Sequence, residues 1–289
     1  MKTCTPRYYQ NVDDQGNVYS QFGEDRIIQD VLKTLGEITA LDKWACEFGA
    51  WDGLHLSNTA NLIVNSGYSA VLIEADPKKF LELKQNMASY PVKCINAFIN
   101  LEGVNTLDSV LSTSSIPKDF DLLSIDIDGA DYWIFEGLEK YRPKVIVIEF
   151  NPTIPKEVEF INSRDILRNQ GSSIRSLAKL AQAKNYKVVG ITLCNLIFVK
   201  DEFKVAFSEN IVQLDELPDP LYINRMWQTF DGQIHTESDL HLLWHDIYRP
   251  NRSIQVLPKS FIFFPENMGK IRKFLFIRWK RIQSKRANK

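Results

Sequence analysis

The segment CEFGAWDG, residues 46–53, places the strongest constraint on the fold of this chain. It reads as a buried strand that ends in a tight turn at Gly49, and the following segment 54–67 has apolar residues at helical spacing. Strand, glycine turn and helix together let a ligand press against bare backbone at the carboxyl end of a sheet. Because the turn carries the acids Glu47 and Asp52, it would repel a pyrophosphate and favours a ligand with an amine, a hydroxyl or a positive charge.

Apolar runs bounded by turns alternate with amphipathic segments along most of the chain. The runs predict strands at 44–49, 69–76, 92–99, 121–128 and 144–150. The amphipathic segments predict helices at 20–35 (with Ser20 as N-cap), 56–66, 77–89, 104–112, 130–141 and 172–185. Two further runs, 186–193 and 195–200, are too close together for a parallel crossover and must form an antiparallel hairpin. We therefore predict an α/β fold with a mostly parallel seven-stranded sheet that ends in an antiparallel hairpin strand.

Charge is distributed unevenly along the 289 residues. The net charge is −1, yet residues 270–289 hold nine Lys and Arg and no acid. A basic tail on an acidic body predicts an anionic partner for the tail and argues against a nucleic-acid-binding body. The N-terminus has no apolar signal core, and the four cysteines are scattered without metal-binding spacing. We therefore expect a cytoplasmic protein.

Six segments between residues 20 and 200 carry a resemblance to a known family. They are SQFGED (20–25), EFGAWDG (47–53) with SNT (57–59), GYSAVLIEADP (67–77), LLSIDIDGADYW (122–133), RPKVIVIEFNP (142–152) and GSSIRSLAKLAQAKNYKVVGITLCNLIFV (171–199). With them the chain resembles the FkbM-like methyltransferases, which have the class I Rossmann-like fold. The resemblance implies S-adenosylmethionine as cofactor and O-methyl transfer, often to a hydroxyl of a sugar, a glycan or another metabolite.

The resemblance, which covers residues 20–200, and the composition on either side of it predict how the chain is divided. Residues 1–19 are an N-terminal arm and residues 20–200 the methyltransferase domain. Residues 201–269 form an extension that helps shape the acceptor pocket, and residues 270–289 form a basic amphipathic tail. The hairpin-like segments 228–235 and 242–245 look like an extension seen in some members of the family.

The implied cofactor site lies at the ends of the first strands. In the family an acid at the end of the first strand holds the cofactor's amino group, and Glu47 takes that place. Glu74 ends the second strand, where an acid can accept hydrogen bonds from both ribose hydroxyls; Asp76 competes with it but can instead cap the next helix. The predicted cofactor-binding residues are Gln21, Glu24, Glu47, Gly49, Asp52, Gly53, Ser57, Asn58, Thr59, Glu74, Ala75, Asn96, Ala97 and Asp126.

Acids are densest in SIDIDGADY, residues 124–132, which admits three interpretations. It could face the methyl donor, provide a phosphatase nucleophile, or bind a divalent metal. The phosphatase motif wants Thr or Val after the glycine and belongs on a chain's first strand, so it fits poorly. The predicted metal ligands are Asp126, Asp128, Glu149 and Asn151, with Mg²⁺ as the ion. The alternative is that Asp128 caps the next helix and Asp126 binds the cofactor or acceptor without metal.

Methyl transfer to oxygen needs alignment and a base. His55, just past the glycine turn, and Asp126 are equal candidates for that base. Two rival functions stay open: a module that binds the cofactor without turnover, and a methyltransferase of a non-sugar small molecule. A nicotinamide-dependent enzyme would need a G-x-G-x-x-G turn, which residues 46–53 do not provide.

The C-terminal region carries two further patterns. His241 and His245 have helical metal-pair spacing, although the surrounding leucines favour a core or acceptor-pocket role. In the tail, one apolar stripe with cations around it predicts a helix that either packs on the domain or lies on an anionic membrane surface. The stripe consists of Ile271, Phe274, Leu275 and Ile282.

Overall fold

The structure is a computed structural model that describes residues 17–165 and 167–287, so most of the predicted N-terminal arm lies outside the described residues. The chain divides into two units, Met1–Leu221 and Tyr222–Lys289. Residues 201–221, which we assigned to the extension, therefore group with the first unit.

The first unit is built on a seven-stranded sheet with the order β3-β2-β1-β4-β5-β7-β6. Its strands are β1 (Trp44–Phe48), β2 (Ser69–Glu74), β3 (Val92–Asn96), β4 (Leu122–Ile125), β5 (Val145–Glu149), β6 (Tyr186–Ile191) and β7 (Asn195–Lys200). Strands β1 to β5 pair in parallel, whereas β7 runs antiparallel to both β5 and β6. The predicted α/β fold with its antiparallel hairpin is confirmed.

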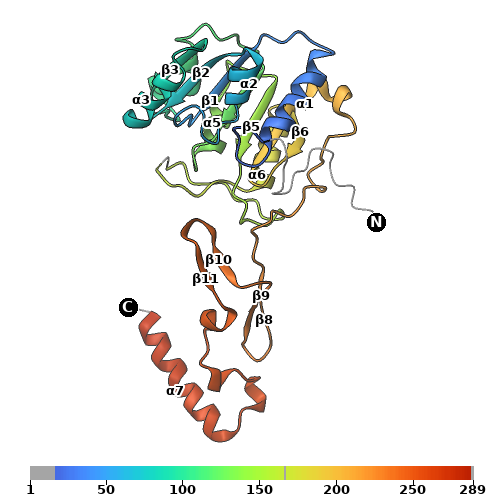
Figure 1. Cartoon of the computed structure of the whole chain (residues 1–289). Coiled ribbons are helices and arrows are strands. Elements are labelled where there is room, and N and C mark those ends of the chain that lie inside the picture. The colour runs from blue at the N-terminus through green and yellow to red at the C-terminus, as the bar shows by residue number, and fades with distance from the viewer. Residues whose placement is uncertain (1–16, 166, 288–289) are drawn as a thin grey trace. The chain divides into compact units, whose positions relative to one another are not determined.

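Helices cover both faces of this sheet (Figure 1). Apolar residues of α1 (Glu24–Gly36), α2 (Ala60–Ser66) and α3 (Pro77–Asn86) pack on one face. Those of α4 (Leu107–Leu111), α5 (Asp131–Gly137) and α6 (Ile174–Ala183) pack on the other. The 3-10 helix η1 (Gly103–Asn105) precedes α4, and η2 (Asp201–Phe207) adds Phe207 to the face that α1 covers.

Two helices begin four residues later than the sequence predicts, because side chains before them bond elsewhere. Helix α1 begins at Glu24, with Gly23 as N-cap and no side-chain cap. Ser20 is therefore not the N-cap; its Oγ accepts the Asp25 N–H at 3.0 Å from outside the helix. Helix α2 begins at Ala60 because residues 57–59 bond to Glu47 instead of extending it.

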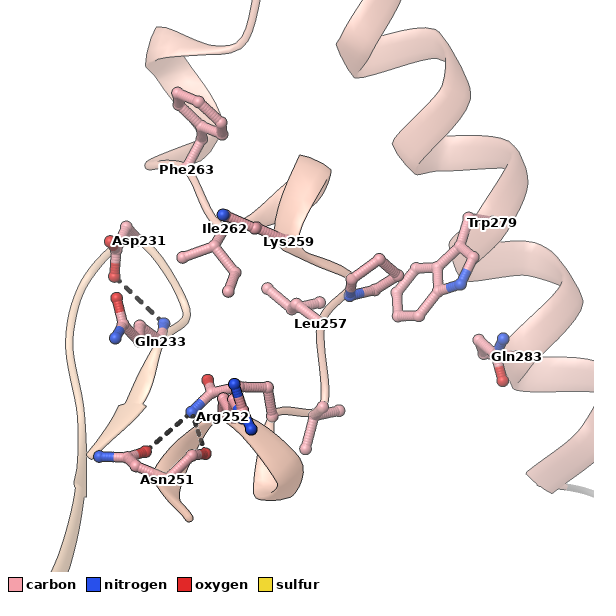
Figure 2. Close-up of a pocket in the computed structure, with 13 residues that line it drawn as sticks. Asp231, Gln233, Asn251, Arg252, Leu257, Lys259, Ile262, Phe263, Trp279 and Gln283 are labelled. Atoms are coloured by element: carbon pink, nitrogen blue, oxygen red, sulfur yellow. Dashed lines mark hydrogen bonds between the residues drawn. The ribbon is translucent and has the colours of Figure 1, made fainter. Parts of the chain in front are cut away.

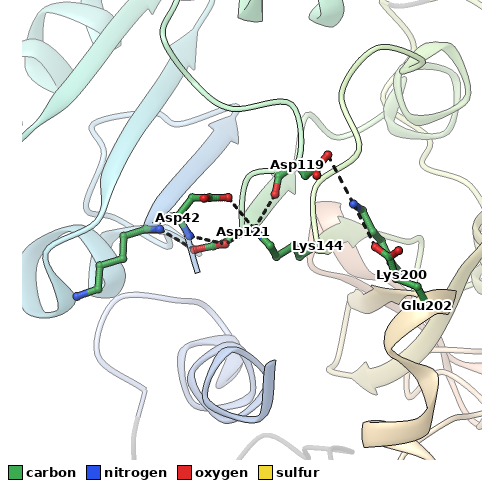
Figure 3. Close-up of polar contacts among 7 residues, drawn as sticks. Asp42, Asp119, Asp121, Lys144, Lys200 and Glu202 are labelled. Carbon is green, nitrogen blue, oxygen red and sulfur yellow. Dashed lines mark hydrogen bonds and ion pairs between the residues drawn. The ribbon is translucent and has the colours of Figure 1, made fainter. Parts of the chain in front are cut away.

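A buried ion pair ties together the amino ends of the central strands (Figure 3). Lys144 Nζ lies 2.9 Å from Asp121 Oδ1 and 2.7 Å from Asp42 Oδ2, and donates to the Asp119 carbonyl at 2.8 Å. Asp121 is fully buried and also accepts the Lys43 N–H at 2.8 Å. Because Asp121 has no access to water, its charge depends on these donors.

The second unit consists of two small hairpins and one long helix. Its elements are β8 (Met226–Gln228), β9 (Ile234–Thr236), β10 (Leu240–Leu242), η3 (Leu243–His245), β11 (Ile247–Arg249), η4 (Asn251–Ile254), η5 (Lys259–Phe261), η6 (Pro265–Asn267) and α7 (Lys270–Ala287). His241 lies on a strand and stacks on Tyr248, whereas His245 ends a 3-10 turn, so the predicted helical spacing of the two is wrong. None of the described helices is long and apolar enough to cross a membrane.

Replacing Lys144 with Met should lower the free energy of unfolding by about 3 kcal/mol, because it leaves the Asp121 charge buried and short of a partner. Urea denaturation measures this. Lys204→Met is the matched control, since Lys204 pairs with Asp201 at an exposed site and its loss should cost less than about 1 kcal/mol. Equal losses in the two variants would contradict the role given to the buried pair.

Candidate active site

Acidic residues gather at the carboxyl edge of the sheet. Because β2, β1, β4 and β5 are neighbours in parallel, their final residues meet at one edge. Glu74 and Glu47 lie at the ends of β2 and β1, Asp126 follows β4, and Glu149 ends β5. The sheet thus brings together four acids that are up to 102 residues apart in sequence.

The turn after β1 is fixed by a close backbone contact. Gly49 has φ +86°, and a Cβ there would lie 1.9 Å from the Asp126 carbonyl oxygen. Asp126 in turn donates its N–H to Phe48 at 3.2 Å. At Gly53, which has φ +81°, a Cβ would meet the ends of the flexible Leu83 and Met87 side chains, which can shift. Gly49 is thus required by a backbone contact within the chain, a reason that the sequence did not reveal.

Glu47 anchors the start of α2. Its carboxylate accepts the Asn58 N–H at 2.8 Å and the Thr59 hydroxyl at 2.7 Å, and it also accepts the hydroxyl of Ser57. All four side chains are buried. Burial raises the pKa of the Glu47 carboxyl, while these three donors act in the opposite direction. The predicted cofactor residues 57–59 thus lie together with Glu47 as its hydrogen-bond partners, and their contact with a cofactor stays a prediction.

Glu74 is held by two backbone amides. Oε2 accepts the Trp51 N–H at 2.8 Å and Oε1 accepts the Asp76 N–H at 2.7 Å. A carboxylate offers about four acceptor positions, so each oxygen keeps one for a ligand. Asp76 caps α3 by accepting the amides of Lys78 and Lys79, as the alternative for that residue anticipated.

The predicted adenine residues lie beside the end of β2. Asn96 Nδ2 donates to the Glu74 carbonyl at 2.8 Å, and the Ala97 N–H donates to the same oxygen at 3.2 Å. Ala75, between Glu74 and the helix cap, is exposed. The ends of β2 and β3 are therefore joined by side chain as well as by backbone, and the Asn96 Oδ1 is left to accept a further donor.

His55 and Asp52 belong to the outer part of the glycine turn. Asp52 Oδ1 accepts the N–H groups of Leu54 and His55 at 2.9 and 2.7 Å. His55 is exposed, and its ring meets Trp51 edge-on at 5.4 Å. Within the described part of the chain its imidazole has no hydrogen-bond partner. The imidazole is therefore accessible to an acceptor molecule, and no hydrogen bond within the described residues orients it.

Three carboxylates form the tightest acidic cluster among the described residues. Oxygens of Asp126, Asp128 and Glu149 lie within 4.8 Å of one another. Burial, and next the charge of Asp131, raise the pKa of Asp126 to about 8. Burial, and next the charge of Asp126, raise that of Glu149 to about 10. The three acids repel one another, so a cation between them would relieve a cost already present in the fold.

The loop that carries this cluster is shaped by Asp131. Its buried carboxylate accepts the N–H groups of Ile127 and Gly129 at 2.9 and 2.8 Å. Asp128 has φ +59° and does not cap α5, whose N-cap is Ala130. The alternative that made Asp128 a helix cap is therefore wrong, and its carboxylate remains available to a ligand.

Asn151 does not fit the fourth metal position that the sequence suggested. Its Oδ1 accepts both the N–H and the hydroxyl of Thr153, at 2.9 and 2.6 Å, and its Nδ2 donates to the Gln170 carbonyl at 2.6 Å. An amide oxygen has two lone pairs, and both are occupied. Asn151 instead holds the connection that follows β5.

That connection, residues 151–173, is fastened to the acidic loop by a residue that sequence reasoning missed. Asn162 is buried, and its Nδ2 donates to the carbonyls of Gly129 and Arg168 at 2.9 and 2.8 Å. Its own carbonyl accepts the Trp133 indole N–H at 2.8 Å. Asn162 therefore holds the connection beside the loop that follows β4. Its only sequence signal is one polar residue in a mixed segment.

The N-terminal motif SQFGED contacts the turn between β6 and β7. Glu24 is buried; it accepts the Thr192 hydroxyl at 2.6 Å and the Asn195 amide at 3.0 Å. Gln21 is exposed, with Oε1 3.8 Å from the Cys194 thiol. Since Asn195 pairs with Glu149, α1 is linked to the end of β5 through the β6–β7 turn.

Residues 102–174 match a family described as the methyltransferase FkbM domain. The match runs from η1 through β4, α5 and β5 to the start of α6, so it contains the acidic cluster and Asn162. The resemblance inferred from the sequence is confirmed.

Solved structures add distant similarities. One is a TehB-like S-adenosylmethionine-dependent methyltransferase from Corynebacterium glutamicum, with 12% identity and a TM-score of 0.38 over 64% of this chain and 90% of that one. Another is precorrin-6y C5,15-methyltransferase from Geobacter metallireducens, with 14% identity and a TM-score of 0.37 over 65% and 95%. No curated protein was found to match. Similarities this low bear on neither substrate nor mechanism.

The second unit has a concavity of its own, of about 1120 Å³ (Figure 2). Its polar side chains mostly hold the unit together: Asp231 accepts the Gln233 N–H at 3.1 Å, and Gln255 accepts the Ile234 N–H at 2.9 Å. Trp279 and Gln283 line it from α7. We assign no ligand to this concavity.

Replacing Gly49 with Ala should cost about 1–3 kcal/mol more in unfolding free energy than replacing Gly67 with Ala. Both glycines have positive φ, so both variants carry the same backbone penalty of about 1–2 kcal/mol. Only Gly49 faces the Asp126 carbonyl, whereas nothing lies within 4 Å of a Cβ at Gly67. Urea denaturation compares the two, and equal costs would show that the close contact is not tight in solution.

Proposed function

We propose that this FkbM-domain protein transfers the methyl group of S-adenosylmethionine to a hydroxyl of a sugar, glycan or related small molecule. The observation that carries the cofactor assignment is the Glu74 carboxylate, fixed by two backbone amides next to the glycine turn with acceptor positions to spare. The sugar assignment rests on the family resemblance.

The charge of the edge fits this cofactor. S-adenosylmethionine supplies an electrophilic methyl group on a positively charged sulfur, next to an ammonium group. Acids at the ends of β1, β2, β4 and β5 provide the opposite charge, whereas they would repel the pyrophosphate of a dinucleotide. The edge therefore favours a cationic nucleoside over an anionic one.

Individual residues then bind and orient the cofactor. Glu74 accepts the two ribose hydroxyls, and Asn96 with Ala97 lines the adenine. Glu47 holds residues 57–59 in place and, as the acid near the end of β1, binds the cofactor's amino group. The remaining residues predicted at the methionine end are Gln21, Glu24, Asp52 and Asp126.

Proton removal from the acceptor has two candidates. Asp126 lies at the strand edge among other acids, which make its carboxylate more basic than an ordinary one. His55 is exposed on the turn. The backbone of each candidate is fixed by a hydrogen bond, Asp126 to Phe48 and His55 to Asp52, but only Asp126 is partly covered at the sheet edge. Asp126 is therefore the base we favour.

A divalent cation is part of the proposal. Asp126, Asp128 and Glu149 offer oxygen ligands close enough for one hard ion such as Mg²⁺. Asn151 is left out because Thr153 occupies its amide oxygen. Such an ion would lower the pKa of an acceptor hydroxyl and orient it. With the ion bound, Asp126 would act as its ligand and would lose the raised basicity that favours it as the base. The residues themselves contribute the negative charge that would hold the ion.

Transfer is tested by incubating the protein with S-adenosylmethionine and panels of sugar and non-sugar hydroxyl acceptors, and measuring S-adenosylhomocysteine release. We expect release only with acceptor present, and with sugars above other hydroxyl compounds. Cofactor binding without release from any acceptor would favour a non-catalytic module.

Replacing Glu74 with Ala should weaken S-adenosylmethionine binding at least tenfold, because hydrogen bonds to a charged group contribute about 1.5–3 kcal/mol. Calorimetry measures the affinity. Asp76→Ala is the matched control: it removes a neighbouring carboxylate that only caps α3, so it should cost about 1 kcal/mol of stability and leave affinity unchanged. An unchanged affinity in Glu74→Ala, with the fold intact by circular dichroism, would eliminate the ribose role.

Chelation with EDTA should abolish turnover, and Mg²⁺ should restore it. Calorimetric titration with Mg²⁺ tests the site without an acceptor: Asp128→Asn should weaken Mg²⁺ binding at least tenfold, since it removes one of three charged ligands. Asp119→Asn, at the opposite end of the sheet, should bind Mg²⁺ like the unmodified protein. Full activity in EDTA would eliminate the metal from the proposal.

A further inference from the structure

The second unit is basic and has almost no interior. Residues 222–289 contain 13 Lys and Arg against 5 Asp and Glu, whereas the rest of the chain has an acidic excess. Among its described residues only Thr236 and Met268 are buried. Counting only the residues that the structure describes, sixteen large apolar side chains of this unit are exposed, against thirteen in the much longer first unit. Apolar surface in this amount, on so small a unit, indicates a binding surface.

One side of helix α7 packs on the rest of the second unit, and another side is exposed. One side packs inward: the rings of Phe276 and Trp279 each lie 5.7 Å from Phe261, and the Arg272 guanidinium lies 3.8 Å above Phe263. A second side carries the stripe predicted from the sequence. Ile271 is 80% exposed, Phe274 63%, Leu275 50% and Ile282 48%. The offsets of three, four and eleven residues place these four side chains on one side of the helix.

Cations lie beside this stripe. Arg278 falls within it by the same helical spacing, and Lys285 follows one turn after Arg281. The helix contains no acid at all. A strongly exposed apolar stripe bordered by cations matches the headgroup boundary of an anionic bilayer, where aliphatic side chains enter the acyl region and cations meet lipid phosphates.

We propose that this side of α7 docks on an anionic lipid surface, with the helix lying in the plane of the interface. The helix is too polar to cross a bilayer, which leaves the in-plane arrangement. This surface is separate from the acidic edge of the first unit and does not depend on the proposed methyl transfer.

Other occupants suit the surface less well. Nucleic acid would meet the cations but would leave Ile271 and Ile282 in water, since aliphatic side chains gain nothing from phosphate. A second copy would bring an equally basic unit against the first, and the two would repel. An anionic membrane satisfies both the charge and the apolar side chains.

The test is sedimentation of the full chain with vesicles of phosphatidylcholine alone and of phosphatidylcholine mixed with phosphatidylserine. We expect binding to the mixed vesicles only, and loss of that binding when salt is raised. The variant Ile271→Ser, Leu275→Ser, Ile282→Ser should bind them about tenfold more weakly.

The matched control carries the same number of apolar-to-Ser changes in the first unit. Leu81→Ser, Val104→Ser, Val205→Ser alters side chains that are 66%, 87% and 81% exposed, and it should sediment like the unmodified protein. S-adenosylmethionine affinity should be the same in all three proteins, which separates this proposal from the function of the first unit. Equal binding by the two variants would overturn the proposal. Failure of the unmodified protein to sediment with the mixed vesicles would also overturn it. A dimer found by light scattering, or RNA binding found by gel shift, would then identify the other occupant.

Discussion

The contact between the turn after β1 and the end of β4 determines the geometry of the candidate site. The Asp126 carbonyl occupies the place where any side chain at position 49 would begin, and Asp126 donates its own amide back to Phe48. Two backbones this close fix the distance between the first acid, Glu47, and the acidic loop. The turn after β1 and the loop after β4 are therefore one assembly, and Gly49 permits it.

The acids at this edge divide into two groups by what satisfies them. Glu24, Glu47, Glu74 and Asp131 each accept hydrogen bonds from the protein, and they shape turns and helix starts. Asp126, Asp128 and Glu149 face one another, and burial with mutual repulsion raises the pKa of Asp126 and of Glu149. The first group fixes the shape of the site, and the carboxylates of the second group remain available to a ligand. A cation, whether a sulfonium or a metal ion, is the ligand that this second group favours.

The sequence predicted the elements that depend on local pattern. Buried parallel strands read as continuous apolar runs, so every strand of the sheet was found, and the short gap at residues 192–194 required an antiparallel pair. The capping role of Asp76 was anticipated as an alternative, because a residue just before Pro77 is a natural helix cap. The FkbM resemblance was recognised from the same strand ends.

The rest depends on contacts that residue patterns do not show. Ser20 looked like an N-cap, but it lies outside α1, and its hydroxyl accepts the Asp25 amide from there. Asn151 was predicted as a metal ligand, but its amide oxygen accepts from Thr153 and its amide nitrogen donates to Gln170. Asn162 gave no signal because its role arises only where residues 129 and 168 meet. In the second unit the pattern predicted a helix and a hairpin, but not that almost nothing there is buried.

A crystal structure with S-adenosylhomocysteine tests the central claim most directly. The account predicts that both ribose hydroxyls lie within hydrogen-bond distance of the Glu74 carboxylate, with the amino acid end of the ligand toward Glu47 and Asp126. A nucleoside bound elsewhere, or a Glu74 carboxylate turned away from it, would contradict the account.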